Sequence, residues 1–160
     1  LSEMRREKDR SLRLKIVRNQ DGRNAYTMSS KHLPTYLFNH DVCLRNVIGK
    51  FLHDRGHYNV SLEKPADASI LHYRFELDNG HMDEKQLEDK LITHYYNINC
   101  QVVFIMRHRE FPHLEVKRLN KVFAVSEKIF PNKPNKVLGA CYTRFLENGL
   151  IYNRKGKTIA

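Results

Sequence analysis

Three carboxylates lie close together in the middle of the chain, at Asp67, Glu76 and Asp78. Apolar, strand-forming residues separate Asp67 from Glu76, and Phe75 and Leu77 alternate with the two later acids. Glu76 and Asp78 are two residues apart, so both side chains point to the same face of a strand. If the chain turns back midway between Asp67 and Glu76, these two acids lie on neighbouring strands.

Three converging carboxylates repel one another, and a divalent cation is the simplest partner that relieves the repulsion. Oxygen ligands of this kind suit magnesium or manganese, so we expect Asp67, Glu76 and Asp78 as metal ligands. The alternative is a solvated strand end beside the Asn79-Gly80 turn. The spacing by itself favours that alternative.

Helices on either side of this hairpin would position the acids. A helix is predicted from Asn39 to Arg55, followed by a strand over residues 58–62. Another helix begins at Asp83, where Gln86 three residues later completes a capping-box pattern. Lys90 lies at the border of this helix's buried stripe, so its alkyl stem can follow the sheet and bring the ammonium to the acids. Lys85, in the first turn, is the second choice.

The rest of the chain alternates between strand and helix patterns. Residues 100–106 are apolar throughout, which indicates an interior strand. A helix around residues 116–123, a strand over 136–142 and a short helix ending at Asn148-Gly149 follow, and a basic tail completes the sequence. This order predicts an α/β fold with a mixed central sheet flanked by helices.

The formal net charge of +10 is concentrated in the two flanks of the sequence. Residues 1–31 hold nine Lys or Arg and four Asp or Glu, and residues 107–160 hold twelve and four, whereas residues 32–106 hold seven and ten. Basic flanks around a carboxylate-bearing centre suit a polyanion lying across a metal site, because the flanks neutralise phosphates. We expect nucleic acid as this polyanion. The alternative is that the charge only keeps the protein soluble.

The basic residues expected to contact DNA lie in two segments. Residues 12–28 predict a β-hairpin with a basic tip. Arg18 and Arg23 flank that tip. They could contact phosphates as the wing of a winged helix does, or they could only keep an edge hairpin solvated. We therefore divide the chain into a basic segment, residues 1–31, and an α/β domain, residues 32–160. The expected DNA-contacting residues are Arg13, Lys15, Arg18, Arg23, Arg107 and Arg109.

The three cysteines, Cys43, Cys100 and Cys141, are widely spaced and include no Cys-x-x-Cys pair. They indicate neither a disulfide framework nor a zinc site, so we expect reduced core residues in a cytoplasmic protein. No apolar run approaches the roughly 20 residues that a membrane span needs. A membrane partner is therefore not expected.

The middle of the sequence resembles the PD-(D/E)XK nuclease fold, and more closely the C-terminal half of the replication-relaxation family of plasmids and other mobile elements. In that family a His-Asp helix start, a Pro-Asp-Ala step and a Phe-Leu-Glu-Val-Asp-Arg-Gly strand end follow one another. The matching segments are His40-Asp41, Pro65-Ala66-Asp67 and Arg74-Phe75-Glu76-Leu77-Asp78-Asn79-Gly80. The resemblance covers about residues 12–150 and implies a restriction-endonuclease-like core, preceded by the wing of a winged helix.

The resemblance implies two functions, and both stay open. The first is a DNA-binding protein of mobile-element DNA processing (plasmid replication, relaxation or transfer) whose nuclease-like domain is inactive. The second is a magnesium-dependent DNA endonuclease or nicking enzyme, in which Lys90 steadies the attacking water. Asp78 stands where the general nuclease motif has lysine, and this departure leaves catalysis in question. Duplex DNA is the expected partner; a homodimer and other DNA-processing proteins are further candidates.

Overall fold

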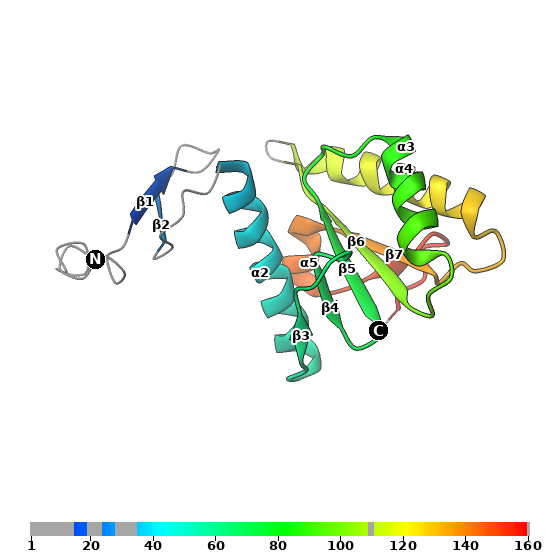
Figure 1. The fold of residues 1–160 in the computed structure, drawn as a ribbon, viewed down its shortest axis with the longest axis horizontal. Coiled ribbons are helices and arrows are strands. Elements are labelled where there is room, and N and C mark those ends of the chain that lie inside the picture. The colour runs from blue at the N-terminus through cyan, green and yellow to red at the C-terminus, as the bar shows by residue number, and fades with distance from the viewer. Residues whose placement is uncertain (1–14, 19–23, 28–34, 109–110, 160) are drawn as a thin grey trace. The chain divides into compact units, whose positions relative to one another are not determined.

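The computed structural model describes residues 15–18, 24–27, 35–108 and 111–159 (Figure 1). The chain divides into two compact units, Leu1–Cys43 and Leu44–Ala160. Helix α2 (Thr35–Arg55) begins in the first unit and continues in the second. The boundary expected after residue 31 thus falls within the first unit.

The first unit contains the expected hairpin. Strands β1 (Lys15–Arg18) and β2 (Asn24–Thr27) pair antiparallel, with Lys15 opposite Thr27 and Arg18 opposite Asn24. Helix α2 starts at Thr35, one turn before the predicted start at Asn39. Neither Gly nor Pro occurs between these two positions, so nothing in the sequence prevents the extra turn.

The second unit is built on a six-stranded open sheet with the strands in sequence order, β3-β4-β5-β6-β7-β8. The first three strands pair antiparallel, β5, β6 and β7 are parallel, and β8 returns antiparallel to β7. The expected mixed α/β architecture is therefore confirmed. The strands are β3 (Val60–Ser61), β4 (Ala68–Ile70), β5 (Tyr73–Asp78), β6 (Gln101–Met106), β7 (Val137–Cys141) and β8 (Tyr152–Asn153).

The described part of the second unit contains four helical segments after β5, and they alternate with the later strands. Asp83 caps α3 with the reciprocal capping box that the sequence predicts, since its side chain accepts from Gln86 N and the Gln86 side chain accepts from Asp83 N. The sequence pattern did not reveal the switch from α3 to a π-helix, or the two-residue strand β8. The helical segments are α3 (Glu84–Lys90), the π-helix η1 (Leu91–Tyr95), α4 (Pro112–Ile129) and α5 (Tyr142–Asn148).

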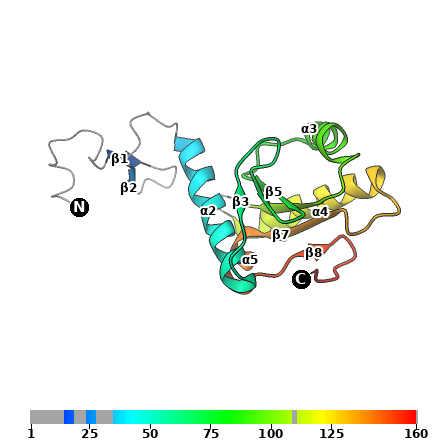
Figure 2. The same cartoon turned by 60° about the horizontal axis from the view of Figure 1, so that its bottom comes forward.

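One face of the sheet packs against α3, η1 and α4. Alternate residues of β6 (Val102, Phe104 and Met106) form a buried cluster with Leu91 and Val122 of the helices. Both views show α3 and α4 close to each other (Figures 1 and 2). This face also carries the acids of β5, because Glu76 pairs with Phe104 across the parallel ladder.

Helix α4 approaches β7 closely at Gly139. A Cβ at this position would lie 2.4 Å from Leu119 Cδ1 of the helix and 3.1 Å from the Phe104 carbonyl oxygen. A larger residue would force the Leu119 side chain to move and would crowd the Phe104 carbonyl.

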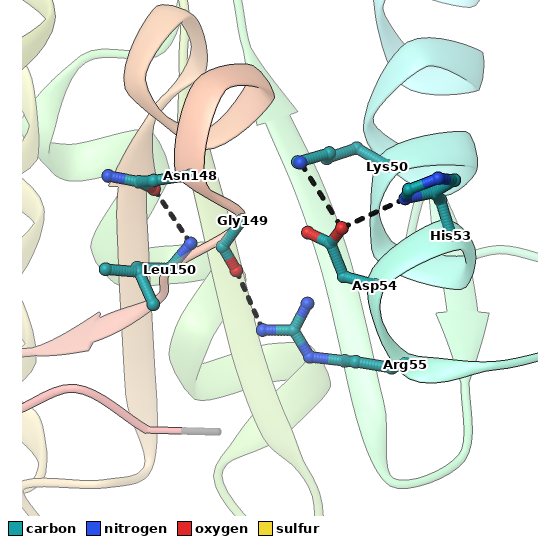
Figure 3. Close-up of polar contacts among 7 residues, drawn as sticks. All are labelled: Lys50, His53, Asp54, Arg55, Asn148, Gly149 and Leu150. Atoms are coloured by element: carbon teal, nitrogen blue, oxygen red, sulfur yellow. Dashed lines mark hydrogen bonds and ion pairs between the residues drawn. The ribbon is translucent and has the colours of Figure 1, made fainter.

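The C-terminal half of α2 and α5 cover the opposite face. Phe51 packs edge-on against Tyr73 and Phe75 of β5, at centroid distances of 5.6 and 5.1 Å. The guanidinium of Arg55 donates to the Gly149 carbonyl at 2.8 Å, which joins the ends of the two helices (Figure 3).

Gly149 ends α5 as the predicted C-terminal glycine, with φ of 68°. A Cβ there would lie only 2.0 Å from Asp54 Oδ2. Asp54 itself accepts from Lys50 and His53, and the His53 hydrogen bond contributes most to holding the pKa of Asp54 below its usual value (Figure 3). The positive φ favours glycine here, and a Cβ would in addition force the Asp54 carboxylate to move.

The cysteines are free and buried, as predicted. No helix in the described part of the chain has the length and apolarity to cross a membrane.

Candidate functional site

The β4–β5 hairpin places Asp67 beside Glu76. Ala68 pairs with Phe75, and Asp67 directly precedes this pair, with its backbone N–H donating to the Phe75 carbonyl at 3.0 Å. Its Oδ2 accepts from Leu77 N at 2.8 Å, while Lys64 Nζ lies 3.8 Å from Oδ1. The expected arrangement of Asp67 and Glu76 on neighbouring strands is thus present.

Glu76 is 2% exposed, and both carboxylate oxygens receive hydrogen bonds from the following helix. The Lys90 ammonium donates to Oε2, and the Tyr95 hydroxyl donates to Oε1. In an α-helix, residues five apart point about 140° away from each other. The wider π-turn over Leu91–Tyr95 lets two residues at this spacing reach one carboxylate. Lys90 therefore lies where its position at the border of the buried stripe predicts, and Tyr95 is a second partner.

Burial is the main influence on the ionisation of this group. It raises the pKa of Glu76 above its usual value, and the negative charge of Asp67 adds to this rise, while Lys90 and the Tyr95 hydrogen bond oppose it. Burial and the adjacent Glu76 also raise the pKa of Tyr95, so the phenol stays a protonated donor. Glu76 is consequently a carboxylate whose charge depends on a nearby cation.

Lys90 lies between this buried carboxylate and an open hollow on the surface. Its side chain is 25% exposed, in contrast to the nearly inaccessible carboxylate beneath it. His94, one turn later, lines the hollow on the same side, whereas Lys85 does not. The hollow is formed by Lys64, Pro65, Gln86, Asp89, Lys90, Thr93 and His94.

Asp78 has different partners from Glu76, although both side chains leave the same face of β5. Its Oδ2 accepts from an Arg118 guanidinium nitrogen of α4 at 2.7 Å, and its Oδ1 accepts from Gly80 N at 2.7 Å. The same Arg118 nitrogen donates to the Met82 carbonyl at 3.0 Å. Asp78 is thus tied to α4 and to its own turn.

The three acids do not gather as one ligand set. Within the described ranges, no three His, Cys, Asp or Glu side chains are grouped in a way that could hold a metal ion. Both oxygens of Glu76 are engaged by Lys90 and Tyr95, so a divalent cation could join Asp67 and Glu76 only if the Lys90 ammonium left Glu76. Both oxygens of Asp78 are engaged as well, by Arg118 and by Gly80 N.

Most of the residues expected to contact DNA have no described side chain. Arg13, Arg23 and Arg109 lie outside the described residues. Lys15 and Arg18 are described through their backbone in β1, where they pair with β2. Their expected contacts with phosphates therefore stay predictions.

Arg107 lies directly after β6, near the Asp78 end of the sheet. Its backbone N–H donates to the Asp78 carbonyl at 2.8 Å. Its guanidinium lies over the Tyr142 ring, 5.9 Å from the centroid. This places a cation beside the parallel strand ends but away from the Asp67–Glu76 pair.

A third buried acid, Glu115, is not marked by any local sequence pattern. It lies in the first turn of α4 and accepts from His108 N at 3.2 Å and from Thr143 N and Oγ1 at 3.5 Å each. Burial raises the pKa of Glu115, and burial and Glu115 together raise that of the Cys141 thiol. These contacts join the segment after β6 to the start of α5, which is a structural role.

No protein-family model, curated protein or solved structure matches this chain.

Proposed function

We propose that the protein binds duplex DNA and that residues 44–160 form a nuclease-like domain of the PD-(D/E)XK type. Its expected setting is mobile-element DNA processing, such as plasmid replication, relaxation or transfer. The observation that supports this most is the contact of Lys90 with Glu76 beside Asp67, at the edge of a surface hollow. The general nuclease motif has its lysine at the position of Asp78, and Lys90 from the next helix would take the place of that lysine beside the carboxylate pair.

The chemistry of the hollow suits a phosphate backbone. Lys64 is 82% exposed and extends beside the hollow, and His94 adds a further nitrogen donor. Lysine is one of the side chains that commonly contact DNA phosphates. The net charge of +10 adds long-range attraction for the same polyanion.

The test is a titration of fluorescently labelled duplex DNA, followed by anisotropy, over a series of salt concentrations. We expect affinity to fall steeply as salt rises, because each phosphate contact releases counterions. Absence of binding at the lowest salt would refute the proposal.

Metal-dependent cleavage of DNA is a second candidate, which the pairing of Asp67 with Glu76 favours. A divalent ion held there would lower the pKa of a bound water and polarise the phosphate. Asp67 and Glu76 would hold it, and the Lys90 ammonium, once released from Glu76, would remain beside the hollow to contact a phosphate oxygen or the attacking water.

Nicking of a supercoiled plasmid in the presence of manganese tests this candidate. If the site is catalytic, Lys90→Met and Asp67→Asn each abolish nicking, while DNA binding by Lys90→Met stays nearly unchanged. If the wild-type protein binds DNA but cuts none with either magnesium or manganese, cleavage is excluded and DNA binding remains as the function. Cleavage that survives Lys90→Met but not Asp67→Asn would exclude the lysine from the reaction.

A further inference from the structure

A cavity of about 320 Å³ lies between α3 and α4, beyond the end of β5. It is distinct from the hollow beside Lys90, and none of its lining residues is shared with that hollow. It lies outside the carboxyl end of β5, which runs parallel to β6.

One wall of the cavity is apolar. Leu87 of α3 and Val122 and Val125 of α4 form it, and all three side chains are buried in the core cluster. Met82 packs against the same cluster. A wall of this kind accepts the flat or apolar body of a ligand.

Two cations lie on the α4 side of the cavity. Arg118 uses one terminal nitrogen for Asp78 and Met82. Its side chain is 23% exposed and lines the cavity. Lys121 lines the cavity three residues after Arg118 and is exposed. A guanidinium and an ammonium therefore line one space.

Two of the three acids around the cavity already have hydrogen-bond partners. Asp78 is bound to Arg118 and Gly80, and Asp83 accepts from Gln86 N as the cap of α3. Glu84 is the third, on the exposed first turn of α3. The side of the cavity formed by α4 is therefore the one suited to an anion.

We propose that this cavity binds one nucleoside 5′-monophosphate unit, with the phosphate on Arg118 and Lys121 and the base against Leu87, Val122 and Val125. The unit has two sources, a free nucleotide or the 5′-phosphorylated end of a DNA strand. The choice of a nucleotide among phosphate esters rests on the proposed DNA function, and the cavity itself lies outside the Asp67–Glu76 site.

The test is isothermal titration calorimetry of the whole chain with dAMP, inorganic phosphate and deoxyadenosine. We expect dAMP to bind, and both fragments to bind at least tenfold more weakly. Lys121→Gln should weaken dAMP binding at least fivefold, and Arg118→Lys, which keeps a charge beside Asp78 but removes the planar guanidinium, should do the same. Lys117→Gln removes a neighbouring exposed lysine that does not line the cavity, and dAMP binding should not change.

Absence of dAMP binding, equal binding of phosphate alone, or no effect of Lys121→Gln would each overturn the proposal. Single-stranded oligonucleotides with and without a 5′-phosphate separate the two sources. A preference for the phosphorylated end that dAMP competes away identifies a strand end, and equal binding of both oligonucleotides identifies a free nucleotide. If dAMP binds but duplex DNA does not, nucleotide binding in the cavity is supported and the proposed DNA-binding function is refuted. If duplex DNA binds but dAMP does not, only nucleotide binding in the cavity is refuted.

Discussion

Glu76 and Asp78 leave the same face of β5 two residues apart, yet they belong to different parts of the molecule. Glu76 is held by Lys90 and Tyr95 from the α3–η1 segment. Asp78 is held by Arg118 of α4 and by the backbone of its own turn. The exposed fractions are 2% and 6%, so burial does not distinguish the two residues.

The difference lies in the cation that each carboxylate meets. The Lys90 ammonium is a point charge on a flexible stem at the edge of an open hollow, where its side chain is 25% exposed. The Arg118 guanidinium contacts both Asp78 and the Met82 carbonyl, so two contacts hold it in place. We infer that the cation paired with Glu76 can be exchanged, whereas the cation paired with Asp78 is held in place.

Arg118→Ala should have the largest effect on stability. It leaves Asp78 buried without its cation, so the free energy of unfolding should fall by about 3–5 kcal/mol. Urea denaturation followed by circular dichroism measures the loss. Arg118→Lys is the control and should lose less. If the free energy of unfolding falls no more than it does in Lys90→Met, the inference that the Asp78–Arg118 pair is held in place is contradicted.

Lys90→Met should cost about 2 kcal/mol near neutral pH, the range for a hydrogen bond to a charged group. The cost should shrink toward pH 4.5. The pKa of Glu76 in the folded protein is raised above 4.5. The contribution of Glu76 to stability is therefore fully present below its pKa in the unfolded chain, and it is lost as the pH rises through its pKa in the folded protein. Removing Lys90 raises that pKa further, so the variant should lose more stability with rising pH than the wild type. A cost independent of pH would mean that Lys90 acts through packing alone.

Glu76→Gln should change stability least, by less than about 1 kcal/mol at pH 7 in metal-free buffer. The amide keeps the shape and removes a buried charge, while Lys90 can turn into the hollow. Its unfolding free energy should also vary less between pH 4.5 and 8 than that of the wild type. Thermal melts across this range measure both effects, and a large loss at neutral pH would show that the ion pair is fixed rather than exchangeable.

Local sequence patterns were sufficient for several features of this region. Alternation predicts the hairpin that places Asp67 beside Glu76, and the spacing of Asp83 and Gln86 predicts the capping box that starts α3. The position of Lys90 at the edge of the buried stripe predicts its direction. Each of these features depends on residues close together in the chain.

Other features depend on contacts that no local pattern encodes. Arg118 lies 40 residues after Asp78, so their pairing, which separates Asp78 from the other acids, follows from how α4 packs. The π-turn that brings Tyr95 to Glu76 has no composition signal in the Leu91–Tyr95 segment. The burial of Glu115 likewise depends on α5 reaching it from a distant part of the sequence.

The most direct test of the proposed function compares Lys64→Gln with Lys117→Gln in binding to labelled duplex DNA across a salt series. Both variants lose one exposed lysine and the same net charge, but only Lys64 borders the hollow beside Lys90. If DNA lies over this hollow, the slope of log affinity against log salt for Lys64→Gln should be shallower by about 0.9, the value for one lost phosphate contact. Lys117→Gln should keep the wild-type slope. Equal slopes for the two variants, or no binding by the wild type at low salt, would contradict DNA binding at this site.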